Sequence, residues 1–261
     1  MGICNLSPDS FSGDGLGENV DLAVAQSKQF VADGADIIDV GGESTRPATG
    51  ARSTVEVEEE LRLVIPVIQR LSRELSVPIS IDTYKSAVAK EAVRAGATMI
   101  NDIWALRRDA RVAEVAAETG VPLVMMSNQR DNPVSEIMST ITADLGRAIK
   151  LALKLGVHWE NIIIDPGIGF GKTLEQNLEI LRRLRELKSL GRPILLGTSR
   201  KSMIGMVLDL PVDQRIEGTA ATVAIGIANG ADIVRVHEVK YMVRVSRMTD
   251  AIMGKKIKET K

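Results

Sequence analysis

Short apolar segments alternate with longer amphipathic segments eight times along the chain. Apolar runs rich in β-branched residues that end at polar residues or glycine are typical of buried parallel strands. We expect strands at 2–6, 36–40, 79–82, 98–101, 122–126, 162–165, 193–197 and 232–236. We expect helices near 19–33, 54–76, 84–95, 109–119, 134–155, 174–190, 213–229 and 238–253, and a short extra helix at 201–208.

Eight strand–helix units in one chain predict an α/β protein with a single (β/α)8 TIM barrel. A doubly wound open sheet, which also alternates strands with helices, is the alternative. The chain has no linker or low-complexity tract, so residues 1–261 are expected to form one domain. The helix near 54–76 has the acidic first turn that suits a helix N-terminus, and Pro66 is expected to kink it.

The segment from Asn161 to Thr173 combines a buried strand with a glycine-rich loop. Its spacing does not match a P-loop, because the position that requires the first glycine is Pro166. The strict alternation of Gly167, Gly169 and Gly171 does not match a dinucleotide fingerprint either. What remains is a carboxylate, Asp165, at the carboxyl end of a strand, followed by a loop that carries an aromatic residue and a cation.

Composition and charge exclude several classes of function. The net charge of −1 gives no field for a polyanion, so nucleic acid is not expected as a partner. The single cysteine, Cys4, cannot form an internal disulfide and is expected in the core. No apolar run reaches the ~18 residues of a membrane span, and no signal peptide pattern begins the chain. We therefore expect a soluble cytoplasmic protein.

Polar residues follow all eight expected strands. In a (β/α)8 barrel the carboxyl-end loops carry the chemistry, whereas the opposite face serves stability. Some Asp and Asn residues at these positions are expected merely as helix caps, but not at every strand. The residues are Asn5, Glu43 to Arg46, Asp82, Asn101, Asp102, Ser127, Asn128, Asp165, Ser199 to Ser202, Arg235 and His237.

The residue types indicate what the site binds. Asp82, Asn101 and Asp165 suit the amidine-like N–H edge of a 2-amino-pyrimidinone heterocycle, with acid–base work by either aspartate as second choice. Arg46, Lys172, Lys201 and Arg235 suit an anionic group, and of these Lys172 is the one most expected to be a solvated surface charge.

The two histidines have different predicted roles. His237 follows the last strand beside Arg235, and their spacing places both side chains on one side of an extended strand. We expect His237 to donate a hydrogen bond to an anionic leaving group. His158 precedes the sixth strand, on the stability face, and is expected to pack or cap there.

Seven segments together resemble the dihydropteroate synthase family, in the order that the family shows, over nearly the whole chain. They are Met-Gly-Ile-Cys-Asn-Leu-Ser-Pro-Asp-Ser-Phe-Ser (1–12), Val-Gly-Gly-Glu-Ser-Thr-Arg-Pro (40–47), Ile-Asp-Thr-Tyr-Lys (81–85), Ile-Asn-Asp-Ile (100–103), Asp-Pro-Gly-Ile-Gly-Phe-Gly-Lys-Thr (165–173), Ser-Arg-Lys-Ser (199–202) and Arg-Val-His (235–237). The resemblance implies condensation of 6-hydroxymethyl-7,8-dihydropterin pyrophosphate with p-aminobenzoate, with Mg²⁺ as cofactor and a homodimeric enzyme.

The resemblance also assigns residues to each ligand. The pterin is assigned to Asp82, Asn101, Asp165 and Lys201. The p-aminobenzoate site is assigned to Phe11, Thr45, Arg46, Pro47, Phe170, Lys201 and Ser202. Pyrophosphate is assigned to Asn5, Arg46, Arg235 and His237, with Asn5 also at the metal. The residues closest to the chemistry are Asp165, Lys201, Arg235 and His237.

The sequence departs from the family at two positions. Ser127 stands where the family usually has a histidine, and Asp14 matches the family's first-loop aspartate only to within one position. Two other functions remain open. One is a methyltetrahydrofolate–corrinoid methyltransferase, which needs no Ser-Thr-Arg-Pro, Ser-Arg-Lys-Ser or Arg-Val-His segment. The other is a catalytically silent pterin-binding protein, which only turnover can exclude.

Overall fold

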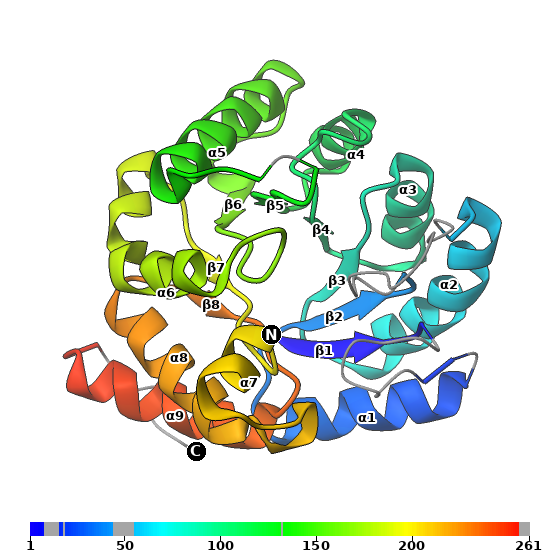
Figure 1. Ribbon diagram of the computed structural model, residues 1–261. Coiled ribbons are helices and arrows are strands. Elements are labelled where there is room, and N and C mark those ends of the chain that lie inside the picture. The colour runs from blue at the N-terminus through cyan, green and yellow to red at the C-terminus, as the bar shows by residue number, and fades with distance from the viewer. Residues whose placement is uncertain (8–15, 18, 44–54, 132, 256–261) are drawn as a thin grey trace.

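The computed structural model describes residues 1–7, 16–17, 19–43, 55–131 and 133–255 (Figure 1). All eight expected strands are present in it. They are β1 (Gly2–Asn5), β2 (Ile38–Gly41), β3 (Ile79–Asp82), β4 (Met99–Asp102), β5 (Leu123–Met126), β6 (Ile162–Asp165), β7 (Leu195–Leu196) and β8 (Ile233–Val234). The last two strands are shorter than the sequence predicts.

The strands close into a barrel. Strands β1 to β6 pair in sequence order and in parallel, and β7 pairs in parallel with β8. A bridge between Ile164 and Ile194 joins the two sheets on one side, and a bridge between Gly2 and Val236 joins them on the other. The Val236 carbonyl accepts the Ile3 amide at 3.1 Å at this second seam. The barrel prediction is therefore confirmed, and the open doubly wound sheet is wrong.

Helices surround the strands in a ring (Figure 1). They are α1 (Val20–Ala32), α2 (Val57–Glu74), α3 (Ser86–Ala95), α4 (Arg111–Thr119), α5 (Ile137–Lys154), α6 (Leu174–Arg183), α7 (Ser202–Leu208), α8 (Ile216–Ala228) and α9 (Val239–Ile252), with 3₁₀ helices η1 (Trp159–Asn161), η2 (Leu184–Leu190) and η3 (Val212–Gln214). The extra helix is confirmed as α7, and the single helix expected at 174–190 is α6 followed by η2. Helix α2 continues through Pro66. No helix of the described residues is long and apolar enough to cross a membrane.

The pleat of the strands divides the core into two zones, because successive side chains point to opposite faces. Residues such as Val40, Ile81 and Ile100 face outward and pack under the helices, where Cys4 is also buried as expected. The inward residues form a separate apolar layer inside the barrel. Its members are Met1, Ile37, Met99, Val124, Ile163, Leu195 and Ile233.

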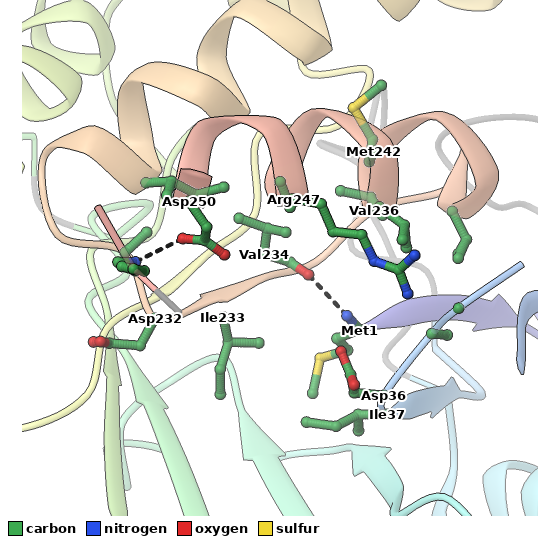
Figure 2. Close-up of a pocket in the computed structure, with 18 residues that line it drawn as sticks. Met1, Asp36, Ile37, Asp232, Ile233, Val234, Val236, Met242, Arg247 and Asp250 are labelled. Atoms are coloured by element: carbon green, nitrogen blue, oxygen red, sulfur yellow. Dashed lines mark hydrogen bonds and ion pairs between the residues drawn. The ribbon is translucent and has the colours of Figure 1, made fainter. Parts of the chain in front are cut away.

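A cavity of about 410 Å³ lies at the amino ends of the strands, which we call the floor of the barrel. Figure 2 shows helix α9 crossing above it, with Met242, Arg247 and Asp250 over the strand ends that carry Ile37 and Ile233. The Met1 nitrogen donates to the Val234 carbonyl at 2.9 Å beside the cavity. The floor is thus built from the amino ends of the strands, from α9 and from the end of α8.

Candidate active site

The polar site lies at the carboxyl ends of the strands, the mouth of the barrel. On four strands its residues come two positions after a member of the inward apolar layer, so the alternation of the strand turns them inward as well. They are Asp39 after Ile37, Asn101 after Met99, Asp165 after Ile163 and Arg235 after Ile233. Asn101, Asp165 and Arg235 were predicted from the sequence, whereas Asp39 was not, although the same alternation identifies it.

Arg235 joins three strands at the centre of the mouth. Its Nε donates to Asp39 Oδ2 at 2.6 Å and its Nη2 donates to Asp82 Oδ2 at 2.9 Å. The same Asp39 oxygen accepts Asn101 Nδ2 at 3.2 Å. Burial raises the pKa of Asp82 to about 7, although Arg235 acts in the opposite direction. The structure thus brings together Asp82, Asn101 and Arg235, as expected from the sequence.

Asp165 ends β6 and is held by the glycine-rich loop that follows. Its Oδ1 accepts the Gly167 amide at 2.7 Å. Burial raises the pKa of Asp165 to about 6, while Gly167 and Lys201 act in the opposite direction. Gly167 has a φ of +71°, and a Cβ there would lie 2.0 Å from the Ser127 carbonyl oxygen. The loop therefore packs directly against the backbone that follows β5.

Lys172 is not the solvated surface charge that we expected. Its Nζ donates to the carbonyls of Ser127 and Gly167, each at 2.8 Å, and to that of Phe170 at 3.4 Å. Burial lowers the pKa of Lys172 to about 7. The expectation is wrong because the glycines fold the loop after β6 back over Lys172. The ammonium of Lys172 then binds the Ser127 carbonyl and so ties this loop to the loop after β5.

Phe170 forms an aromatic wall at the mouth with two cations at its ring. Lys201 Nζ lies 4.2 Å from the ring centroid, and Arg130 Cζ lies 4.3 Å from it. Burial, together with Arg235 and Arg130, lowers the pKa of Lys201 to about 7. The pairing of Phe170 with Lys201 agrees with the sequence. Arg130, from the loop after β5, was not predicted, because nothing in the sequence marks that loop as turned toward Phe170.

His237 is held by Ser199. The Ser199 Oγ lies 2.8 Å from His237 Nδ1 and also accepts the His237 backbone N–H at 3.2 Å. Glu238 accepts from Ser199 at 3.3 Å and from Arg200 Nε. The ring of His237 is thus fixed just after β8, at the mouth.

His158 lies just before η1 and β6, at the floor end as expected. However, its side chain is exposed and makes no capping bond to η1; only its backbone carbonyl accepts, from the Asn161 amide at 3.0 Å. His158 is therefore the N-cap residue of η1, which agrees with the capping expectation, but it caps through its backbone, and the packing alternative is wrong.

Ser127, at the family's histidine position, belongs to a buried polar cluster. Its Oγ donates to Asp144 Oδ2 at 3.3 Å and accepts Gln129 Nε2 at 3.0 Å. Its backbone N–H donates to the Asp165 carbonyl at 2.9 Å. Ser127 therefore connects β5 to α5 and β6.

The remaining predicted residues have different outcomes. Asn5 is the last residue of β1 and is half-buried, and Ser202 is exposed at the start of α7. Among the described residues no three His, Cys, Asp or Glu side chains gather as a metal site. Phe11, Asp14, Thr45, Arg46 and Pro47 lie outside the described residues.

The chain is similar to known proteins over almost its full length. Residues 1–237 match the pterin binding enzyme family. A dihydropteroate synthase of Bacillus subtilis (strain 168) is 51% identical over 255 residues, which cover 98% of this chain and 88% of the relative. The crystal structure of dihydropteroate synthase from Clostridium difficile in the presence of pteroic acid has a TM-score of 0.90 and 53% identity, covering 97% of this chain and 95% of that one. Dihydropteroate synthase from Xanthomonas albilineans with 4-aminobenzoic acid has a TM-score of 0.90 and 40% identity, covering 98% and 93%.

The barrel and its mouth thus define a pterin-binding enzyme of the (β/α)8 class. Within that class the chain belongs to the dihydropteroate synthase family, whose members are transferases. The resemblance seen in the sequence is confirmed.

Proposed function

We propose that this chain condenses 6-hydroxymethyl-7,8-dihydropterin pyrophosphate with p-aminobenzoate, releasing pyrophosphate and forming 7,8-dihydropteroate. The observation that carries the proposal is the convergence of Asp82, Asn101 and Asp165 at the mouth of the barrel, beside the half-buried cations Lys201 and Arg235. The solved relatives were crystallised with pteroic acid, the oxidised counterpart of the proposed product, and with 4-aminobenzoic acid, one of the two proposed substrates.

The pterin is proposed to lie against Asp82, Asn101, Asp165 and Lys201. With a pKa of about 6, Asp165 is mostly ionised at pH 7 and accepts hydrogen bonds from the N–H edge of the ring. When pyrophosphate leaves, positive charge develops on the pterin, and a buried carboxylate stabilises it strongly because little water screens the interaction. Asp165 then acts by electrostatic stabilisation rather than by proton transfer.

Pyrophosphate is proposed to bind Asn5, Arg46, Arg235 and His237. Arg235 uses two of its five N–H donors on Asp39 and Asp82, so donors remain for an anion. The expected cofactor, Mg²⁺, usually keeps several waters and binds phosphate oxygens together with few protein ligands. The single side-chain oxygen of Asn5 fits such an ion. When bound, Mg²⁺ would neutralise charge on the leaving pyrophosphate.

The p-aminobenzoate site is proposed to include Phe170, Lys201 and Ser202, with Phe11, Thr45, Arg46 and Pro47 as further members. The aromatic face of Phe170 suits the ring of the substrate, and the cations beside it suit the carboxylate. The amine of p-aminobenzoate is neutral at pH 7, so its attack on the methylene carbon requires no strong general base.

For the whole protein we propose one pterin-binding domain over residues 1–261, a cytoplasmic location and a homodimer. Cys4, the single cysteine, is buried and suits a reducing compartment. Exposed apolar side chains on α7 and α8, which contact each other, suit an interface between two copies. They are Met206, Val207, Leu208 and Ile225.

Pyrophosphate release tests the proposed reaction. We expect release from the pterin pyrophosphate only when p-aminobenzoate is present, together with 7,8-dihydropteroate in equal amount. Pterin binding without turnover would instead support the silent pterin-binding protein. Methyl transfer from methyltetrahydrofolate to a corrinoid would support the methyltransferase.

A further inference from the structure

The backbone of Arg200 adopts a conformation that its side chain disfavours. Its φ is +57°, in the left-handed region where glycine and asparagine are common and arginine is not. A residue in this conformation is strained and keeps it only where the surrounding structure holds it. Arg200 lies in the turn between β7 and α7, directly before Lys201. The strained residue thus adjoins a residue that is proposed to contact both substrates.

Helices α8 and α9 hold Arg200 in this conformation. Its backbone N–H donates to Thr219 Oγ1 at 3.2 Å, and its carbonyl accepts Arg215 Nη1 at 2.9 Å. Arg215 is the N-cap residue of α8, and Thr219 lies one turn further along the same helix. The Arg200 side chain is held as well, because its Nε donates to Glu238 Oε1 at the start of α9. Both polar groups of the strained backbone are therefore bonded.

Arg215 binds both ends of the segment that contains α7. One end is the Arg200 carbonyl, and the other is the Leu210 carbonyl, which accepts Arg215 Nε at 3.1 Å. The guanidinium lies against Gly205 in the middle of α7, where a Cβ atom would overlap it. Glycine is unfavourable inside a helix, so the close approach of Arg215 gives a physical reason for Gly205. One side chain thus fixes how α7 and the turn before it sit on α8.

The Arg200 turn carries two groups of the proposed site. Lys201 follows Arg200, and its Nζ lies 4.2 Å from the centroid of the Phe170 ring. Ser199 precedes Arg200, and its Oγ lies 2.8 Å from His237 Nδ1. A rotation of the Arg200 backbone would change the angle between these two neighbours. Lys201 could then not keep its place at Phe170 while Ser199 keeps its place at His237.

We infer that Arg215 is a positioning residue for Lys201, because it holds the left-handed backbone of Arg200 that directs Lys201 into the mouth. The inference rests on the proposed function, which assigns Lys201 to the pterin and to p-aminobenzoate. Arg215 acts through the backbone that it binds and needs no contact with either substrate.

The protonation of the Lys201 ammonium reports its position independently of the reaction. Burial is the largest of the causes that lower the pKa of Lys201 to about 7. Of the charged groups that face it, the two arginines act in the same direction and the two aspartates in the opposite direction; they are Arg235, Arg130, Asp165 and Asp82. If the Arg200 turn relaxes, the ammonium leaves these surroundings, and the pKa of Lys201 should rise toward its ordinary value of 10.5. A role of Arg215 in stability alone would lower the unfolding temperature and leave this pKa unchanged.

The first experiment compares Arg215→Met with Arg185→Met. Arg185 is an exposed arginine that also donates to a backbone carbonyl, that of Ala228 at 3.1 Å. Acetylation of Lys201 as a function of pH, followed by mass spectrometry, gives the pKa of its amine, and thermal unfolding reports the fold. We expect a midpoint near 7 in the wild type and in Arg185→Met. In Arg215→Met it should lie at least about one pH unit higher. An unchanged midpoint in a folded Arg215→Met protein would overturn the inference.

Steady-state kinetics separate failure of the inference from failure of the proposed function. Arg215→Met should lower kcat/KM for the pterin pyrophosphate at least about tenfold, because a small displacement of a positioned group is costly in catalysis. Arg185→Met should match the wild type. If the wild type releases no pyrophosphate, or if Lys201→Met keeps wild-type kinetics, the proposed function or the proposed site is wrong. The acetylation midpoints still decide in that case whether Arg215 positions Lys201.

Substitution of the strained residue tests whether Arg215 acts through it. Asparagine tolerates the left-handed region better than arginine does, so a chain with Arg200→Asn needs less support there. Arg215→Met should therefore raise the Lys201 midpoint much less in the Arg200→Asn background than in the wild type. Equal shifts in the two backgrounds would contradict the inference.

Gly205→Ala replaces Arg215→Met if that variant does not fold. The added methyl group displaces the guanidinium of Arg215, while alanine favours the helical conformation of α7. Positioning should thus be lost without unfolding, and the Lys201 midpoint should rise as it does in Arg215→Met. A wild-type midpoint in Gly205→Ala would count against the inference.

Discussion

The two ends of the barrel use charged residues in opposite ways. At the floor, Asp232 pairs with Lys188 at 2.5 Å, and the two side chains are 41% and 40% exposed. At the mouth, Asp39 pairs with Arg235 at a similar distance, but the side chains are 0% and 20% exposed. The same kind of ion pair is thus exposed at the floor and largely buried at the mouth.

The difference shows where the protein accepts an energetic cost for its function. Surface ion pairs change stability little, whereas removing charges from water is expensive. At the mouth, burial raises the pKa of Asp82 and Asp165 and lowers the pKa of Lys172 and Lys201. A fold that needed only stability would place apolar residues there, as it does one layer below.

Removal of Arg235 should give the largest difference between the two ends. Arg235→Ala leaves Asp39 and Asp82 buried without their cation, which should cost about 3–5 kcal/mol of the free energy of unfolding. Arg247→Ala, beside the floor cavity, should change it by less than about 0.5 kcal/mol, because Arg247 is exposed. Urea unfolding of both variants measures this, and similar losses would contradict the contrast.

The pH dependence of stability should show the cost at Asp165. Its pKa is raised from 3.8 to about 6 in the folded chain, so the folded state holds the proton more tightly than the unfolded state. The stabilisation that comes from this tighter proton binding is complete below pH 3.8. It is lost as the pH rises through 6, which lowers the free energy of unfolding by about 3 kcal/mol in all. As the pH rises from 4 to 6.5, the free energy of unfolding of Asp165→Asn should therefore fall less than that of the wild type. Parallel unfolding curves for the two proteins would refute the assignment of this cost.

The same substitution should damage catalysis. At pH 7.5 we expect Asp165→Asn to lose about 1.5–3 kcal/mol of pterin and transition-state binding, because a charge-assisted hydrogen bond becomes a neutral one. The matched floor variant is Asp232→Asn, whose carboxylate accepts from Lys188 and from the Ile194 amide. It should lower stability slightly and leave pyrophosphate release unchanged. Near-normal kinetics in a folded Asp165→Asn protein would contradict the proposed role.

Substitution of the two histidines should give the smallest difference between the mouth and the floor of the barrel. His237→Ala should weaken the binding of pyrophosphate with Mg²⁺ by about 1 kcal/mol, because one hydrogen-bond donor is lost. His158→Ala should leave it unchanged, since that side chain is exposed near the floor. Titration calorimetry measures both affinities. Equal effects would mean that the two histidines do not belong to different ends of the barrel.

The sequence predicted the barrel well because its signals are local. Apolar runs such as Ile162 to Ile164 and the turns after them are readable without knowledge of the fold. The strand ends Asp82 and Asp165 follow from the same runs. Strands β7 and β8 are shorter than predicted, because their extent depends on pairing with neighbours rather than on composition.

The residues that were missed or misjudged depend on tertiary contacts. Lys172 is half-buried and bonded to backbone carbonyls only because the loop after β6 folds onto the Ser127 carbonyl, and no local pattern reports that contact. Arg130 reaches Phe170 across the same pair of loops. Asp39 is different, because alternation from Ile37 predicts its direction. It lies inside β2 rather than at its end, so the rule that polar site residues follow the strands does not include it.

The glycines of the loop after β6 limit how this site can change over evolutionary time. A side chain at Gly167 would meet the Ser127 carbonyl oxygen at 2.0 Å, and one at Gly171 would meet the Gln129 backbone at 2.3 Å. Both residues also have a φ of +71°, which side chains disfavour. An inhibitor that rests on this loop therefore contacts a surface that single substitutions cannot easily reshape. Escape from such an inhibitor would have to come from other loops of the mouth, where side chains can change without displacing backbone.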